Sequence, residues 1–379
     1  MQFNYYCPTE LRVGRGQLAS LAESVDELGK RPLVVIDPDV RKVSASAQQS
    51  CTVLSRSGLS AEIFEEIPSN PNIETVTAGA EVFRKHQADV VVAIGGGSAL
   101  DSAKAIAAVA EHGGSIWDYI GDDLVPGPIA PIVAVPTTAG TGSETTPFAV
   151  FTDKGSRRKD GMYSRYFYPR LSILDPEIYC TLPPQITAET GMDALAHAIE
   201  GFTARTKNSL CNSLALEAVR LIARSLTISV QDGSNLEARQ EMALASALAG
   251  IVITHCGVGA AHGVGMSLGG LYDVPHGRAI AMLLPSVMEF NRQAAPDQFA
   301  ALHRVFQGAD PDMDQQQNVA EIVSALARKI GIPVKLSDLG VRSEQIDELL
   351  NDAMSRQDMQ NNARTIDRAD AEQLLRTLL

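Results

Sequence analysis

The sequence has 379 residues, of which 45% are hydrophobic and 20% charged, and its formal net charge is −13. This length exceeds what one hydrophobic core usually supports, so we expect two domains of a globular enzyme rather than a disordered or fibrous chain. The negative charge opposes nonspecific binding to nucleic acid or anionic lipid, because like charges repel.

The first half, between residues 31 and 175, alternates short apolar runs with helix-sized segments. The runs read RPLVVIDPD, AEIFEEI, ADVVVAIGGG, PIVAVPTT and RLSILDP. Near-continuous apolar runs separated in this way are typical of buried parallel strands. We therefore predict an α/β dinucleotide-binding domain over residues 1–182, with a doubly wound, mostly parallel sheet.

The second half has long stretches rich in alanine and leucine, with apolar spacing near 3.6 and no convincing strand. This pattern predicts an all-helical domain over residues 183–379. The boundary falls at Pro183 and Pro184, which we expect to interrupt regular structure.

A glycine turn, Gly95-Gly96-Gly97-Ser98, joins an apolar strand to a helix-forming stretch. Glycines let the backbone approach a pyrophosphate, and the helix amino terminus offers free N–H groups and a positive dipole end. The turn therefore predicts phosphate binding. The alternative is a tight structural turn in which Ser98 or Asp101 caps the helix.

A second polar loop, residues 136–144, also follows an apolar strand and carries hydroxyl groups and glycines. Polar loops at the carboxyl ends of neighbouring parallel strands predict one shared crevice for a dinucleotide. Asp37, at the end of the first strand, is placed to accept hydrogen bonds from a ribose, which favours NAD over NADP. The alternative for Asp37 is a turn-forming residue before Pro38.

Asp193 and His197 are four residues apart, so on a helix they project from one face and suit a single ion. His262, expected to end a glycine-broken helical stretch, and His276, expected in a turn after Pro275, are further candidates. A carboxylate with three imidazoles suits iron(II) or zinc. A histidine on an alanine-rich helix is more often a hydrogen-bonded core residue. The chain has only seven histidines, however, and four of the five in this half lie among small apolar residues.

The amino terminus lacks a basic segment followed by an apolar stretch, and no run reaches the roughly 18 apolar residues that span a bilayer. We therefore expect a cytoplasmic protein. The five cysteines are scattered and form no CxxC pair, which favours reduced thiols over disulfides or a structural zinc site.

The stretches GGGSALDSAK, PTTAGTGSE and DALAHAIE, in this order, resemble the iron-containing, group III alcohol dehydrogenase family. The resemblance runs from Gly14 to about Asn291. It implies a pyrophosphate loop, a nicotinamide loop, a lysine near the ribose and an asparagine near the adenine. The corresponding cofactor candidates are Gly96, Gly97 and Ser98, then Thr137, Thr138, Thr141 and Ser143, then Lys159 and Asn70, with Asp37 and Asp101 added from the same region. It also implies that Asp193, His197, His262 and His276 hold a divalent ion, for which iron(II) is favoured and zinc is the alternative.

One position departs from the family pattern. Well-known members usually carry a histidine four residues after the first of the later two metal histidines, where it assists proton transfer, and this chain has Met266 there. If the intervening glycines do not break the helix, His255, His262 and Met266 share one face. His255 is then a candidate proton relay, and its alternative is a core histidine bonded to a backbone carbonyl.

The resemblance implies reversible hydride transfer between an alcohol and NAD, with the reverse reaction reducing an aldehyde or ketone. The alternatives are a metal-free carbonyl reductase of the maleylacetate type, a zinc polyol dehydrogenase of the glycerol type, a lyase similar to dehydroquinate synthase, and a non-enzymatic binding module. Tyr163 and Arg165 are candidates to meet a polar or anionic substrate group, or else form a stacking surface. Apolar helical surfaces favour a homodimer or larger homo-oligomer.

Overall fold

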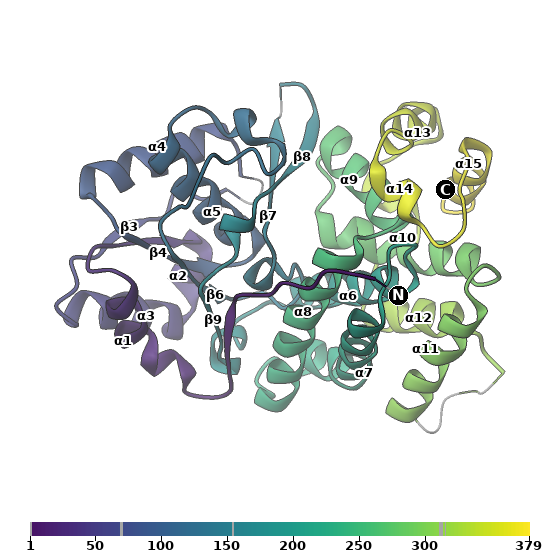
Figure 1. The fold of residues 1–379 in the computed structure, drawn as a ribbon. Coiled ribbons are helices and arrows are strands. Elements are labelled where there is room, and N and C mark those ends of the chain that lie inside the picture. The colour runs from purple at the N-terminus through teal and green to yellow at the C-terminus, as the bar shows by residue number, and fades with distance from the viewer. Residues whose placement is uncertain (1, 69–70, 154, 311–313, 315) are drawn as a thin grey trace. The chain divides into compact units, whose positions relative to one another are not determined.

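The computed structural model describes residues 2–68, 71–153, 155–310, 314 and 316–379. They form two compact units, and neither is one continuous segment (Figure 1). The sheet unit contains residues 6–182 and 233–247. The helical unit contains residues 1–5, 183–232 and 248–379.

The sheet unit is built on a six-stranded sheet with the order β1-β9-β6-β4-β2-β3, and every paired neighbour in it is parallel. Its strands are β1 (Glu10–Val13), β2 (Pro32–Ile36), β3 (Glu62–Phe64), β4 (Val90–Gly95), β6 (Ile132–Pro136) and β9 (Leu171–Leu174). The five apolar runs account for all of these strands except β1. The predicted parallel α/β fold followed by a helical domain is confirmed.

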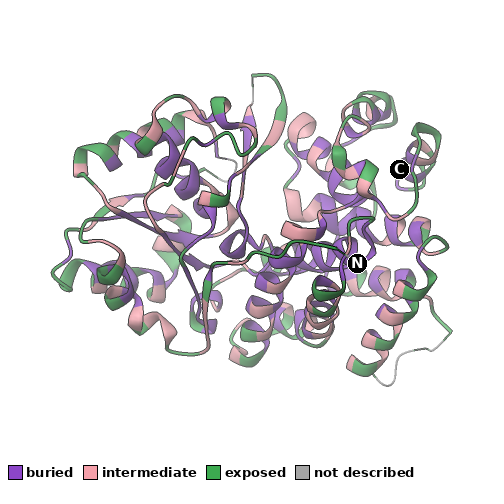
Figure 2. Cartoon of the chain, viewed as in Figure 1, coloured by how far each residue is buried: buried purple, intermediate pink, exposed green. Residues whose placement is uncertain are grey.

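Both faces of the sheet are covered, which explains why the strands are apolar without alternation. All five residues of β2 are buried. Leu33 and Val35 belong to one core cluster with α4 and α5, whereas Val34 and Ile36, also fully buried, point to the other face. Figure 1 shows α4 and α5 on one side of the sheet and α1 and α3 on the other, and Figure 2 shows the buried strands between them.

The helices of the sheet unit connect these strands. They are α1 (Leu21–Leu28), α2 (Pro38–Val43), α3 (Ala45–Arg56), α4 (Ile73–His86) and α5 (Gly97–His112), with 3-10 segments η1 (Gln17–Ser20), η2 (Ile116–Tyr119), η3 (Ser143–Thr145), η4 (Arg165–Phe167) and η5 (Pro176–Tyr179). A smaller sheet joins β5 (Gly121–Asp122), β8 (Arg158–Tyr163) and β7 (Phe148–Asp153), with β7 and β8 antiparallel. The sequence patterns did not predict this second sheet.

The helical unit contains no strand among its described residues. Its helices are α6 (Pro184–Thr203), α7 (Ser209–Gln231), α8 (Leu236–Cys256, counted in the sheet unit as far as Ala247), α9 (Ala260–Tyr272), α10 (His276–Asn291), α11 (Pro296–Ala309), α12 (Val319–Lys329), α13 (Ile346–Ala353), α14 (Gln357–Asn361) and α15 (Arg368–Arg376), with η6 (Leu336–Leu339) and η7 (Ser343–Gln345). Helix α10 packs on α6 and α9, and α9 also packs on α13 and α14.

Pro184 does not interrupt regular structure as expected, because it is the first residue of α6. Proline is tolerated there, since the first helical N–H has no partner within the helix.

Within the described residues, no single helix has the length and apolarity to cross a membrane. One pair of helices, α8 and α9, passes that test together, but the pair is bent by 100°.

Candidate metal centre and dinucleotide turn

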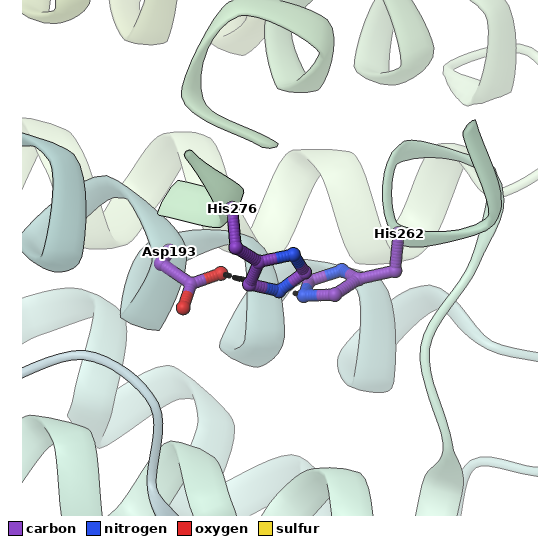
Figure 3. A group of neighbouring side chains, drawn as sticks. All are labelled: Asp193, His262 and His276. Carbon is purple, nitrogen blue, oxygen red and sulfur yellow. Dashed lines mark ion pairs between the residues drawn. The ribbon is translucent and has the colours of Figure 1, made fainter. Parts of the chain in front are cut away.

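Three side chains from separate helices converge in the helical unit. Asp193 lies in the middle of α6, His262 in the first turn of α9, and His276 at the start of α10. One potential ligand atom from each lies within 4.8 Å of the other two. Figure 3 shows the carboxylate and the two rings directed toward one another. These are three of the four residues predicted to hold a metal ion.

The two histidines are placed by helix starts, which corrects the predicted local structure. His262 does not end a helical stretch, because Gly259 is the N-cap of a new helix, α9. His276 does not lie in a turn, because Pro275 is the N-cap and His276 the first residue of α10. Each side chain is therefore held in the first turn of a packed helix.

The group has two buried atoms that lack hydrogen-bond partners. Asp193 Oδ1 and His262 Nε2 are 3.4 Å apart, and neither has a hydrogen-bond partner among the described residues. Oδ1 is also 3.8 Å from His276 Nε2. Unpartnered buried polar atoms are costly. Because carboxylate oxygen and imidazole nitrogen are ligands for divalent iron and zinc, the residues fit such an ion.

The charges around these atoms favour opposite protonation states. Desolvation raises the pKa of Asp193, but His197, His276 and His262 outweigh it and hold the pKa below its usual range. Desolvation lowers the pKa of His262, but the charge of Glu200, the hydrogen bond to Glu200 and the charge of Asp193 outweigh it and raise the pKa to about 10. A cation at this position is therefore favoured, whether it is a proton or a metal ion.

His197 lies beside this group but is not one of its three members. Its Nε2 is 3.9 Å from Asp193 Oδ1, and its ring stacks on that of His262 with centroids 4.5 Å apart. The spacing of four residues on α6 does bring Asp193 and His197 together. Its role as a fourth ligand stays a prediction.

His255 does not share a helical face with His262 and Met266, so that expectation is wrong. Helix α8 ends one residue after His255, and the bend of 100° between α8 and α9 breaks the register. The Nδ1 atom of His255 is 2.8 Å from the carbonyl of Ile251, and its ring stacks on Tyr5. Its role as a proton relay stays a prediction without that geometric support.

In the sheet unit, the glycine turn and the second polar loop lie against each other. Strand β4 ends at Gly95, α5 begins at Gly97, and β4 pairs with β6, which leads into the loop. A Cβ on Gly97 would lie 2.8 Å from Thr141 Cγ2, and one on Gly96 would lie 3.1 Å from Thr138 Cγ2. Both threonines are half-buried. The glycines thus let the second loop pack closely against the amino terminus of a 16-residue helix. A helix amino terminus is suited to a phosphate.

Ser143 and Asp101 bond to each other, whereas the hydroxyl of Thr137 has no hydrogen-bond partner among the described residues. Thr137 and Ser143 are buried, and Ser143 Oγ donates to Asp101 Oδ1 at 2.6 Å. Asp101 Oδ2 accepts from the N–H of Val150 at 2.9 Å. The carboxylate of Asp101 therefore ties α5 to the loop through Oδ1 and to strand β7 through Oδ2. Its contact with a cofactor stays a prediction.

The remaining cofactor candidates differ in their surroundings. Asp37 caps α2 by accepting from Asp39 and Val40, as its turn-forming alternative implied, and its Cβ lies close to Gly95. Lys159 lies on β8, half-buried, where its charge acts on Asp101. Ser98 lies in the first turn of α5. Asn70 lies outside the described residues.

The substrate candidates Tyr163 and Arg165 lie on the small sheet and the segment after it. The ring of Tyr163 packs on Phe148 with centroids 5.5 Å apart. The guanidinium of Arg165 lies over the ring of Tyr6, 5.7 Å from its centroid. Arg165 therefore takes part in stacking, the alternative weighed from the sequence.

Sequence reasoning missed two buried charged residues beside these sites. Glu200, one turn after His197 on α6, contacts His262. Lys104 on α5 is fully buried and donates to Ser143, Thr146 and Phe148. Desolvation lowers the pKa of Lys104 to about 8, against the charges of Asp101 and Glu144. Glu200 could have been found from its spacing, because it follows Asp193 by seven residues and so shares its helical face.

A sheet with a glycine turn, combined with a carboxylate–imidazole group, is typical of metal-dependent dehydrogenases. The family model "Iron-containing alcohol dehydrogenase" matches residues 8–176, and "Fe-containing alcohol dehydrogenase family, C-terminal" matches residues 187–379. The chain belongs to the iron-containing alcohol dehydrogenase family. It is therefore an alcohol dehydrogenase, an oxidoreductase that acts on CH–OH groups.

Similar proteins span nearly the whole chain. A 1,3-propanediol dehydrogenase of Citrobacter freundii is 39% identical over 346 residues, which are 90% of this chain and 89% of that protein. An NAD-dependent methanol dehydrogenase of Bacillus methanolicus is 33% identical over 99% of this chain and 100% of that protein. The crystal structure of a 1,3-propanediol oxidoreductase matches with a TM-score of 0.94 and 34% identity, covering 100% of both chains.

Proposed function

We propose that the chain catalyses reversible hydride transfer between small primary alcohols and NAD, with a divalent ion held by Asp193, His197, His262 and His276. The observation that carries this proposal is the convergence of a buried carboxylate and two imidazoles on one point. The dependence on NAD is supported by the name of the relative from Bacillus methanolicus. Iron is favoured by the family description.

The bound ion would supply a Lewis acid that lowers the pKa of the alcohol. The chain's own residues set where this happens. Asp193 and His262 are almost fully buried, while the side chain of His276 is 26% exposed. Substrate therefore approaches past His276, and the buried side of the group excludes water.

The glycine turn would hold the cofactor. The first N–H groups of a helix have no acceptor in the preceding turn, and the helix dipole adds a positive partial charge, so the start of α5 at Gly97 is suited to the pyrophosphate. Thr138 and Thr141, which border these glycines, are half-buried, and their hydroxyl groups can donate hydrogen bonds. Asp101 and Lys104 hold the loop that carries the threonines in place.

The substrate class is inferred from relatives that act on 1,3-propanediol and methanol, according to their names. Both are small primary alcohols. The experiment is a substrate panel of such alcohols, polyols and hydroxy acids, with NADH formation followed at 340 nm before and after chelation. Protein purified without oxygen is analysed for metals in parallel.

We expect NADH formation with small primary alcohols, loss of activity on chelation, and recovery with iron(II). Full activity without metal would instead favour the metal-free carbonyl reductase. Zinc content with a preference for polyols would favour the polyol dehydrogenase, and absence of net NADH formation would favour the lyase class. Equal rates on alcohols and hydroxy acids would remove Arg165 from substrate recognition. The homo-oligomer and the cytoplasmic location stay predictions.

A further inference from the structure

Glu200 is a buried carboxylate that the proposed reaction does not use directly. It lies on α6 one turn after His197, and it is 3% exposed. A buried carboxylate is costly unless hydrogen bonds satisfy it. Both of its oxygens are used, and both of their partners belong to the first turn of α9.

The first contact fixes the ring of His262. Glu200 Oε2 lies 2.5 Å from His262 Nδ1. Because an ionised carboxylate can only accept, Nδ1 carries the proton, and Nε2 of a neutral ring is left with its lone pair. Nε2 is the atom that faces Asp193 Oδ1 at 3.4 Å. The contact thus selects the tautomer that can bind an ion beside Asp193.

The second contact fixes the helix that carries this ring. Glu200 Oε1 accepts from the backbone N–H of Ala261 at 2.8 Å. The N-cap residue of α9 is Gly259, which makes no side-chain capping bond. The carboxylate of Glu200 therefore occupies the place of a cap and lies at the positive end of the α9 dipole. Gly259 leaves room for it, because a Cβ there would lie 2.9 Å from Glu200 Oε1.

We infer that Glu200 is a positioning residue that sets the affinity for the divalent ion by fixing both the tautomer of His262 and the start of α9. This inference rests on the proposed function, since it requires an ion at Asp193, His262 and His276. Partners of this kind typically change metal affinity by about 10- to 100-fold.

The variant Glu200→Gln tests the inference with little change of volume. A glutamine has one oxygen and one amide nitrogen, so it can accept from Ala261 or from His262 but not from both. The matched control is Asp352→Asn on α13. Asp352 accepts from Ser267 of α9 at 2.6 Å and pairs with Arg356, so the control also replaces a carboxylate that holds α9.

The metal-free protein and both variants are titrated with Co²⁺ and Zn²⁺ by calorimetry, and the visible spectrum of the Co²⁺ form is recorded. We expect Glu200→Gln to bind about 10- to 100-fold more weakly with an altered Co²⁺ spectrum. Asp352→Asn is expected to keep the affinity and spectrum of the parent protein. Equal affinities for parent and Glu200→Gln, or equal losses in both variants, would overturn the inference.

Absence of binding by the parent protein would instead overturn the proposed function. A measurement on the parent protein covers the case in which Glu200→Gln does not fold. In Zn²⁺-loaded protein labelled with ¹⁵N in histidine, the signal of His262, assigned by its loss in His262→Gln, should show a proton on Nδ1. A proton on Nε2 would contradict the role of Glu200.

Discussion

The stability of the sheet unit should depend on pH through Glu144, which lies in η3 and is 1% exposed. Oε1 accepts from Ser246 at 3.0 Å, and Oε2 has no partner among the described residues. Desolvation raises the pKa of Glu144 from 4.5 to about 7, against its hydrogen bonds and the charge of Lys104. The folded protein therefore keeps a proton that the unfolded chain loses.

The sign and size of the effect follow from this difference. Between about pH 4.5 and 7 the folded state binds more protons at this position, so the free energy of unfolding falls as pH rises. A change from 4.5 to about 7 corresponds to roughly 3 kcal/mol once the pH exceeds 7. Glu144→Gln removes the ionisation, so its stability relative to the parent should grow by about this amount between pH 4.5 and 8.

The assay is urea unfolding followed by the fluorescence of Trp117, the only tryptophan, which lies in the sheet unit. The control is Glu237→Gln, which changes an exposed carboxylate on α8. The control and the parent should differ by a constant amount over this pH range. A constant difference between Glu144→Gln and the parent would refute the reasoning.

Three other variants probe the two sites. Asp193→Asn should weaken binding of Zn²⁺ by at least about 100-fold in calorimetry, because a ligand should contribute no less than its supporting partners; unchanged affinity would rule out this metal centre. Gly97→Ala should raise the KM for NAD roughly 10-fold, because its Cβ would lie 2.8 Å from Thr141 Cγ2. The control Gly308→Ala, which has open space around its Cβ, should leave that KM unchanged. Equal KM values for NAD in both variants would contradict the proposal that the glycine turn binds the cofactor. His255→Ala should alter the pH profile of kcat if His255 relays a proton, and an unchanged profile would remove it from the mechanism.

Four strands of the large sheet, β2, β4, β6 and β9, could be predicted because each is a mostly apolar run that is buried throughout. The patterns missed β1, whose four residues alternate charged and apolar side chains, and β8, which reads RKDGMY. Strand β8 is formed by pairing with β7, which is a tertiary effect that its own composition does not show.

The metal centre was only partly predictable for a related reason. Helical spacing brings Asp193 and His197 together, but nothing in local sequence places His262 and His276 beside them, and that assignment came from the resemblance. The prediction that His255 and Met266 share one helical face was wrong because a new helix starts after Gly259, which changes the helical register. Glu200 was missed because a carboxylate on a helix usually faces solvent, and its partner lies 62 residues away.

Helix α9 has two glycines in close contact with neighbouring helices, Gly263 and Gly265, and one larger side chain, Met266, that is only half-buried. A Cβ on Gly263 would lie 2.7 Å from Met359 Sδ of α14, and one on Gly265 would overlap Ile280 of α10. These contacts fix the position of α9 against α10 and α14, and therefore the position of His262. The side chain of Met266, in contrast, is only half-buried. The side chain at position 266, where the resemblance implies a proton relay in relatives, can therefore be exchanged without rebuilding the metal centre. Enzymes that share one ion but differ in proton chemistry can thus lie a single substitution apart.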